Sequence, residues 1–426
     1  MAIDRKATQA LLKDIDTLTQ QFEAKLPRRF QGELQRLVMG PALEELRRFI
    51  IEGRPPRLFF MGRAGHGKSS LINALAGKEV AATHVVRPQT SKSERYSVRF
   101  EERYASWDVI DSRGIFDPTP PEGAEEKDAL AQLRKDLLEY RPDLILHVIS
   151  APEVRAMSPD LLATRTLFSG LKKDLKPFPC LAAVVSKVDT LGDPAVWPPE
   201  DSPKGGHILE VMEYLSDQVL KAEKKGALDP ANHLKGYVLE DDEYRGVIPV
   251  RSLFSKTWNL EALIEFCGNH LPDETQLDFA QGLGRKEQMV KLADSITWRF
   301  ASIAGGIGAI PIPVADIVLL APLQLLLIGI IGGLSCQPFS QETIQKYLSS
   351  AGLAVGGGIA LRYAAQELIK VVPVAGEVVS GAIAYSGTLA IGKAASAYFF
   401  HGEETHPQSI FAEAQKWWGT WRSKTE

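Results

Sequence analysis

Cysteine is scarce in this sequence of 426 residues, which contains only Cys180, Cys267 and Cys336. Their number is odd, they lie far apart, and none has a histidine at the spacing of a metal-binding motif. This scarcity argues against a disulfide framework and against a zinc finger. A reducing compartment is the natural setting for such a chain.

An excess of positive charge is also lacking. The chain has 49 Lys and Arg against 53 Asp and Glu, a formal net charge of -4, so the composition indicates no nucleic-acid partner. The charged start, residues 1–6, lacks the apolar core of a secretory signal peptide, and we expect no such signal. The hydrophobic fraction of 45% excludes disorder as a description of the whole chain.

Charge of either sign is rare in one region. Residues 301–400 carry only eight charged side chains, although charged residues make up 24% of the chain, and they hold 14 of its 35 glycines. Within this region, residues 317–334 form an 18-residue run whose only polar side chain is Gln324, at the lower end of the length that spans a bilayer. The composition predicts a separate hydrophobic helical domain, which is either membrane-associated or soluble with a buried central helix.

The rest of the chain shows alternating elements. Helical spacing of Leu11, Ile15 and Leu18 predicts N-terminal amphipathic helices over residues 1–52. Short apolar runs then alternate with helical stretches, which predicts an α/β domain with a mostly parallel sheet and helices on both faces. We place this domain at 53–272, the hydrophobic helical domain at 273–400 and a Trp-rich tail at 401–426. The tail suits either a membrane interface or packing onto the N-terminal helices.

A phosphate-binding loop is the clearest motif. The segment from Gly62 to Ser69 reads Gly-Arg-Ala-Gly-His-Gly-Lys-Ser, follows the apolar run 58–61 and leads into a helical segment. In such loops backbone N–H groups bind phosphates, the lysine reaches the outer phosphates, and the serine hydroxyl binds Mg²⁺. The candidate nucleotide-binding residues of this segment are Gly62, Arg63, Ala64, Gly65, His66, Gly67, Lys68, Ser69 and Ser70.

A second motif, Asp111-Ser-Arg-Gly114, follows another predicted strand. The Asp111 carboxylate can hold Mg²⁺ through water, and the N–H of Gly114 can sense the γ-phosphate.

Two further motifs address the base. Ser186-Lys187-Val-Asp189 ends the predicted strand 182–185, and its Asp189 carboxylate can accept hydrogen bonds from the N1–H and N2–H₂ groups of guanine, which adenine lacks. The Lys187 stem can cover the base. The Pro249-Val-Arg-Ser segment could offer backbone N–H groups of Arg251 and Ser252 to the guanine O6. Because strand ends of a parallel sheet meet at one edge, we expect these motifs to lie together.

Together with Leu71-Ile-Asn-Ala-Leu-Ala-Gly77, this ordered set resembles the small GTP-binding proteins of the translation-factor and Era/TrmE-like class, over about residues 53–272. The resemblance implies GTP or GDP with Mg²⁺ as ligands and GTP hydrolysis as the reaction. It also implies an effector-loop threonine that closes on Mg²⁺ and the γ-phosphate, for which Thr90 matches best and Thr83 competes. The implied catalytic residues are Lys68, Thr90 and Gly114, and the implied metal ligands are Ser69, Thr90 and Asp111.

A second resemblance rests on the phrases Ile-Pro-Ile-Pro-Val-Ala-Asp316 and Val-Pro-Val-Ala-Gly-Glu377. They are similar to a bacterial family in which an Era-like domain precedes an uncharacterised, membrane-associated hydrophobic domain. This resemblance implies membrane lipid as a partner and a place on the cytoplasmic face of the membrane. A soluble cytoplasmic protein is the alternative.

Departures from the GTPase pattern modify these expectations. Ser186 stands where the class has Asn or Thr, which removes an amide that would tie the base loop to the phosphate loop. Arg251 replaces a small residue. Ile115 stands where Ras-like proteins have a water-orienting glutamine, so we expect slow intrinsic hydrolysis that needs a G-domain dimer or an activating partner. Arg63 and Arg113 could stabilise the transition state or simply pack on the loop.

Three functions fit this sequence. The first is a GTPase switch whose hydrolysis changes how the helical regions engage a membrane or partner. The second is a dynamin-like protein that self-assembles on a membrane. The third is a scaffold that binds GTP without hydrolysing it.

Overall fold

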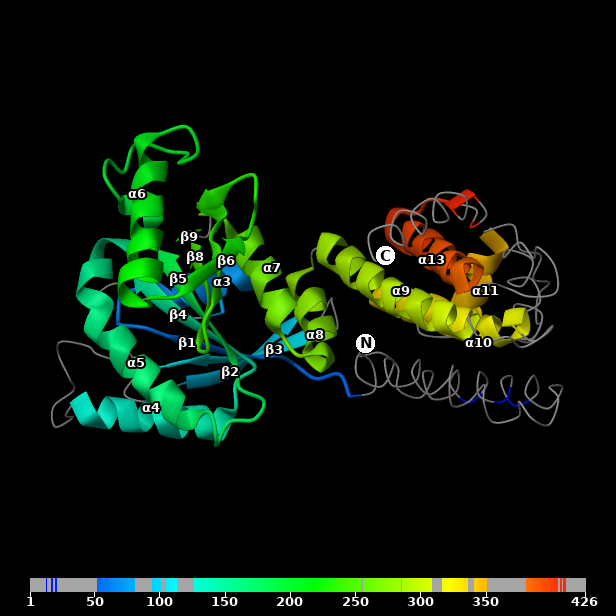
Figure 1. The fold of residues 1–426 in the computed structure, drawn as a ribbon, viewed down its shortest axis with the longest axis horizontal. Coiled ribbons are helices and arrows are strands. Elements are labelled where there is room, and N and C mark those ends of the chain that lie inside the picture. The colour runs from blue at the N-terminus through cyan, green and yellow to red at the C-terminus, as the bar shows by residue number, and fades with distance from the viewer. Residues whose placement is uncertain are drawn as a thin grey trace. The chain divides into compact units, whose positions relative to one another are not determined.

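The computed structural model describes residues 52–80, 94–100, 105–112, 126–253, 256–284, 286–308, 316–335, 341–350 and 381–404, with a few isolated positions besides. The chain divides into two compact units (Figure 1). The first contains residues 54–100 and 105–283, and the second contains the helices from residue 286 onward.

An eight-stranded sheet forms the centre of the first unit, in the order β2-β3-β1-β4-β5-β8-β7-β6. The strands are β1 (Arg57–Met61), β2 (Glu94–Phe100), β3 (Ala105–Asp111), β4 (Leu144–Ser150), β5 (Cys180–Ser186), β6 (Glu223–Ala227), β7 (Tyr237–Glu240) and β8 (Tyr244–Pro249). The five central strands β3, β1, β4, β5 and β8 are parallel, whereas β2, β7 and β6 pair in antiparallel fashion at the edges. The central strands therefore form the expected parallel core, and the antiparallel edge strands make the sheet as a whole mixed.

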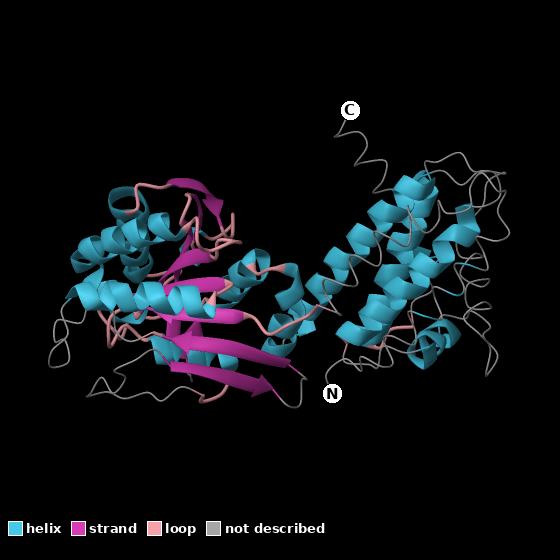
Figure 2. Ribbon diagram, turned by 90° about the horizontal axis from the view of Figure 1, so that it is seen from below, coloured by secondary structure: helices cyan, strands magenta, loops and turns pink. Residues whose placement is uncertain are grey.

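Helices cover both faces of the sheet, as Figure 2 shows. They are α3 (Lys68–Ala76), α4 (Glu126–Tyr140), α5 (Ser158–Leu171), α6 (Pro203–Glu213), α7 (Leu260–His270) and α8 (Asp273–Leu283). Side chains alternate along β1, so that Phe59 and Met61 join the core beneath α4, α5 and α6, while Leu58 and Phe60 join the core beneath α3, α7 and α8. Burial on both faces explains why the central strands read as continuous apolar runs.

Short elements complete the first unit. They are η5 (Ala151–Met157), η6 (Val188–Thr190), the π-helical η7 (Tyr214–Val219), η8 (His233–Lys235) and the hairpin of β9 (Arg251–Leu253) and β10 (Lys256–Trp258).

Helix α8 packs against β3 of the sheet. The Trp107 indole N–H donates to the Asp278 carbonyl at 3.2 Å, and the Trp107 ring stacks on Phe279 with the ring centroids 5.3 Å apart. A Cβ atom at Gly282 would lie only 2.4 Å from the Trp107 Nε1, so this contact requires glycine. We placed the end of the nucleotide-binding domain at residue 272, and α8 belongs to the same compact unit.

The second unit is helical. Its described elements are α9 (Lys286–Gly308), α10 (Asp316–Leu334), α11 (Gln341–Ser350), α13 (Gly381–Ser396) and the π-helical η9 (Ala397–His401). Helix α10 contacts α9, α11 and α13, and every residue from 320 to 334 is buried. Inside the bundle, the Gln324 side-chain amide donates to the Thr388 hydroxyl at 3.3 Å. Helices α9 and α13 approach closely, because a Cβ atom at Gly392 would lie 2.3 Å from the Thr297 Cγ2.

Our expectation of a membrane-spanning run at residues 317–334 finds no support. Over the described part of the chain, none of the helices combines the length and hydropathy that crossing a bilayer requires. The alternative that the composition left open, a buried central helix, describes α10 as the structure has it. The predicted N-terminal helices, the Trp417 to Trp421 cluster and both Pro-Val-Ala phrases lie outside the described residues, apart from isolated positions.

Candidate nucleotide-binding site

The predicted phosphate loop connects β1 to α3, at the carboxyl end of the parallel strands. Gly65 and Gly67 have φ angles of 75° and 92°, in the left-handed region that favours glycine. At Gly62, with a φ of 143°, a Cβ atom would lie 2.3 Å from the Val148 carbonyl oxygen of β4. The loop therefore lies directly against a central strand, while Ala64 and Gly65 are exposed at its outer side.

Lys68 begins helix α3 and folds back over the loop. Its ammonium group donates to the carbonyls of Gly62 at 3.0 Å and Arg63 at 3.2 Å. Next to it, the Ser69 hydroxyl donates to the Asp111 Oδ2 at 3.3 Å. The structure thus places two predicted metal ligands, from β3 and α3, within hydrogen-bond distance of each other. Ser70 follows in the first turn of α3 and is half-buried.

Ser186, at the end of β5, touches the phosphate loop. Its hydroxyl lies 2.5 Å from the His66 carbonyl and 3.2 Å from the Ile149 carbonyl, and its one proton can be donated to either. We expected the loss of an amide at this position to leave the base loop untied. The structure corrects that expectation, because the shorter serine hydroxyl makes the connection itself.

The predicted base loop continues from Ser186 into η6. Lys187 adopts a left-handed φ of 55°, and Asp189 follows on the 3-10 turn. The buried ammonium group of Lys204, from the first turn of α6, donates to the carbonyls of Asp189 at 2.6 Å and Leu191 at 2.7 Å. Sequence reasoning missed Lys204, because a lysine at the start of a helix carries no motif that marks it as an internal anchor.

The side chain of Arg251 contacts Asp189, and the expected backbone role of Arg251 toward the guanine O6 stays a prediction. The Arg251 Nε lies 3.3 Å from the Asp189 Oδ2, and both side chains are mostly buried. The Arg251 guanidinium lies over the Trp197 ring, 4.8 Å from its centroid. Trp197 in turn packs edge-on against Trp258, which pairs with Arg251 across the β9–β10 hairpin. Ser252 is buried beside Arg251 on β9.

Arg63 pairs with helix α5. Its guanidinium makes two hydrogen bonds with the Asp160 carboxylate of α5, at 2.7 and 2.9 Å. Such a paired geometry fixes the arginine against α5.

His66 is buried within the loop. Its Nδ1 lies 3.2 Å from the Val148 carbonyl and its Nε2 lies 3.2 Å from the Glu153 carboxylate, and burial lowers the pKa of the imidazole. His147, fully buried on β4, lies 2.8 Å from the Tyr244 hydroxyl, and burial lowers its pKa to about 3. The lowered pKa values favour the neutral form of both imidazoles near pH 7, so the positive charges of the loop are those of Lys68 and of Arg63, which is paired with Asp160.

Several predicted residues cannot be placed. Thr90, its competitor Thr83, Arg113, Gly114 and Ile115 lie outside the described residues. The described part of the site therefore comprises the phosphate loop, one carboxylate of the predicted metal site and the base loop.

Residues 57–179 match the family model described as 50S ribosome-binding GTPase. The match includes the phosphate loop and Asp111 and ends before the base loop at Ser186. Over these residues the chain is similar to that GTPase family. A search of curated proteins found no match.

Solved structures show a distant similarity. Era of Aquifex aeolicus, bound to GDP and aluminium fluoride, is 16% identical with a TM-score of 0.32, covering 57% of this chain and 67% of that chain. The probable GTP-binding protein engB is 16% identical with a TM-score of 0.30, covering 49% and 94%. Toc33 of Arabidopsis thaliana, with Mg²⁺ and GMPPNP, is 17% identical with a TM-score of 0.29, covering 47% and 71%. We base no assignment on similarity of this degree.

Proposed function

We propose that the first unit binds GTP and GDP with Mg²⁺ at the carboxyl edge of its parallel strands and hydrolyses GTP. The observation that carries this proposal is the convergence of four strand ends. The phosphate loop follows β1, Asp111 ends β3, Asp189 follows β5, and Arg251 follows β8. Ligands of open α/β sheets bind at this edge, outside the carboxyl ends of the strands.

The phosphate loop would hold the nucleotide phosphates with its backbone N–H groups and with Lys68. In the structure, the Lys68 ammonium donates to two loop carbonyls. An ammonium has three donors, so phosphate oxygens can be added to these acceptors or replace them. The N-terminus of α3 begins at the same residue and adds positive potential.

The donor set beside the loop fits Mg²⁺, which prefers oxygen ligands and keeps several of its waters. The Ser69 hydroxyl would bind the ion directly and the Asp111 carboxylate would bind it through water. When bound, the ion would neutralise negative charge on the phosphates. Thr90 as a further ligand remains a proposal from the sequence.

The base loop would read guanine with the Asp189 carboxylate. A carboxylate offers about four lone-pair positions, and guanine needs two of them for its N1–H and N2–H₂ donors. The contact with Arg251 engages one oxygen, Oδ2, from the protein side. Lys204 holds the backbone of the same loop in place. We infer that Arg251 and Lys204 position Asp189 for the base while Lys187 covers it.

We propose slow intrinsic hydrolysis, because Ile115 cannot orient a water as glutamine does. We also propose that the N–H of Gly114 senses the γ-phosphate. We propose a switch role as the first of the three functions that fit the sequence. Coupling to a membrane, dynamin-like assembly and a non-hydrolysing scaffold gain no support from the described residues. The family description names the ribosome as a partner of its members, which weakens the composition-based expectation that no nucleic acid takes part.

The experiment compares the unmodified protein with Ser69→Ala, each in the presence and in the absence of Mg²⁺. Affinity for a fluorescent GDP and phosphate release from GTP are measured with and without EDTA. We expect EDTA to weaken nucleotide binding and stop phosphate release in the unmodified protein, and to change Ser69→Ala much less.

The matched control is Ser302→Ala, which removes an exposed helix hydroxyl in the second unit. It should behave as the unmodified protein does. Absence of any GDP binding, or an EDTA effect of the same size in Ser69→Ala, would refute the proposed site.

A further inference from the structure

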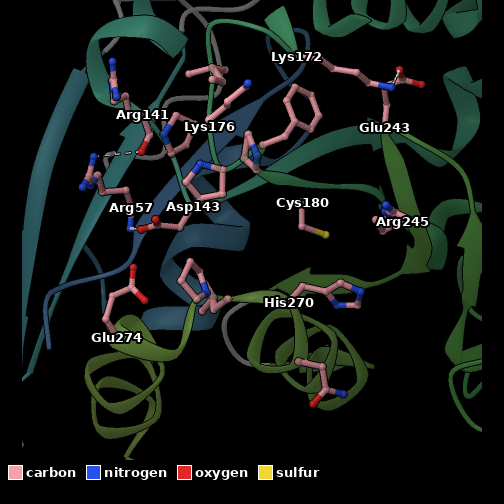
Figure 3. A pocket seen from close by; sticks show the side chains of 18 of the residues that line it. Arg57, Arg141, Asp143, Lys172, Lys176, Cys180, Glu243, Arg245, His270 and Glu274 are labelled. Atoms are coloured by element: carbon pink, nitrogen blue, oxygen red, sulfur yellow. Dashed lines mark hydrogen bonds and ion pairs between the residues drawn. The ribbon is translucent and has the colours of Figure 1, made fainter. Parts of the chain in front are cut away.

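A cavity lies at the opposite ends of the same strands. It has a volume of about 750 Å³ and is lined by the residues where β1, β4, β5 and β8 begin, together with the loops that precede them (Figure 3). All of its lining residues belong to the first unit. Because parallel strands end at the nucleotide edge, a cavity at their starts shares no residue with the proposed GTP site.

The carboxylates that line this cavity are already paired. Six Lys or Arg side chains and four Asp or Glu side chains line it. Arg54 binds Asp143 at 2.7 Å and Glu274 at 3.2 Å. Lys172 binds Asp242 at 3.0 Å and Glu243 at 2.8 Å. Two cations therefore account for all four carboxylates.

Four cations of the lining remain, and one of them, Arg57, donates to the Tyr140 and Arg141 carbonyls at 3.1 Å. The side chains of Arg141, Lys176 and Arg245 make no ion pair within the described part of the chain. Figure 3 shows Arg245 with His270 on one side of Cys180, and Arg141 and Lys176 on the opposite side. All three cations are exposed to solvent.

The titratable groups between these cations do not offset their charge. Burial raises the pKa of the Cys180 thiol to about 12, and burial lowers the pKa of His270. The thiol is therefore uncharged near pH 7 and the imidazole is neutral. His270 donates its Nδ1–H to the Phe266 carbonyl at 2.8 Å, which leaves Nε2 as an acceptor.

Apolar groups supply the rest of the lining. They are Leu175, Pro177, Phe178, Pro179, Leu271 and Pro272. A concave site of several hundred cubic ångströms with an apolar lining and a few charged groups is typical of small-molecule pockets. A phosphate monoester carries a charge of about -1.5 to -2 at pH 7. It therefore matches several cations better than a carboxylate, which carries a single negative charge.

We propose that this cavity binds a small organic phosphate, whose flat apolar body lies on Phe178 and the prolines and whose anionic groups pair with Arg141, Lys176 and Arg245. The two-sided arrangement of the cations favours a molecule that carries acidic groups at both ends. The site is independent of the proposed nucleotide function.

The test uses phenyl phosphate as the probe and the full chain saturated with GDP and Mg²⁺, so that the phosphate loop is occupied. Binding is measured by ligand-observed NMR titration. We expect phenyl phosphate to bind more tightly than phenol or inorganic phosphate alone. Lys176→Ala and Arg245→Ala should each weaken it about fivefold, the effect of one partly exposed charge contact.

The control is Lys173→Ala, which removes the same charge from an exposed position three residues away that does not line the cavity. It should leave phenyl phosphate affinity unchanged. Failure of the probe to bind the unmodified protein would overturn the proposal, as would equal weakening by Lys173→Ala and Lys176→Ala. GDP binding is measured separately. If GDP does not bind, this result counts against the GTP site, but the comparison of Lys176→Ala with Lys173→Ala still tests the phosphate cavity.

Discussion

Removal of one hydroxyl, in Ser186→Ala, tests whether the base loop is tied to the phosphate loop. Both partners are inaccessible, since Ser186 is 0% and His66 is 1% exposed, and their oxygens lie 2.5 Å apart. Alanine leaves the buried His66 carbonyl without this hydrogen-bond donor. Leaving a buried polar group unsatisfied costs about 1–3 kcal/mol. We expect the free energy of unfolding, measured in urea, to fall by that amount.

The same change should weaken GDP binding, because the nucleotide has to order two loops that no longer support each other. Fixing a loosened side chain on binding costs about 0.5–1.5 kcal/mol, which corresponds to roughly a two- to twelvefold rise in the dissociation constant. Thr190→Ala is the matched control. Its hydroxyl also donates to a carbonyl, that of Lys187 at 2.7 Å, but it is exposed and stays within the base loop. If Ser186→Ala and Thr190→Ala had equal effects on both measurements, the tie would have no energetic role.

The other predictions concern the two loops and the helical unit. Lys68→Ala should weaken GDP binding at least tenfold in a calorimetric titration, since a charge-assisted hydrogen bond contributes about 1.5–3 kcal/mol; unchanged affinity would remove the phosphate-loop assignment. Arg251→Ser should weaken GDP binding by about 0.5–1.5 kcal/mol, because Asp189 loses the group that orients it; tighter binding would instead mean that the arginine competes with guanine. Gly392→Ala should lower the stability of the helical unit by about 1–3 kcal/mol, since the added methyl group would overlap Thr297, and an unchanged melting temperature would contradict that packing.

The central sheet and the phosphate loop could be predicted because their signals are local. A loop of fixed spacing between an apolar strand and a helix specifies its own geometry, and the structure has β1, the loop and α3 in that order. The antiparallel edge strands could not be predicted in the same way. Strands β6 and β7 are short, and direction in a sheet depends on pairing with partners distant in sequence.

Side-chain contacts at the site were harder to predict than its backbone. Ser186 was expected to loosen the base loop, yet it reaches the His66 carbonyl because the phosphate loop lies so close to β5. Arg251 was assigned through its backbone, and the contacts of its side chain with Asp189 and Trp197 were not anticipated. These contacts join segments far apart in the sequence, and a motif pattern carries no information about them.

The apolar run at 317–334 shows the limit of composition. A helix that is apolar on all sides can be buried in lipid or in protein, and hydropathy alone does not distinguish the two. The structure surrounds α10 with α9, α11 and α13. Hydropathy does not indicate which apolar helices pack on this run, nor that two of them, α9 and α13, approach each other closely at Thr297 and Gly392.

The most direct test of the central claim is nucleotide choice, measured by calorimetric titration of GDP, ADP and XDP into the unmodified protein and Asp189→Asn. Two hydrogen bonds from guanine to a carboxylate contribute about 3–6 kcal/mol together, so the unmodified protein should prefer GDP over ADP by roughly a hundredfold or more. Asp189→Asn should lose GDP affinity and gain XDP affinity, because the amide can donate to the second carbonyl of xanthine. Equal affinity of the unmodified protein for GDP and ADP would contradict the guanine site.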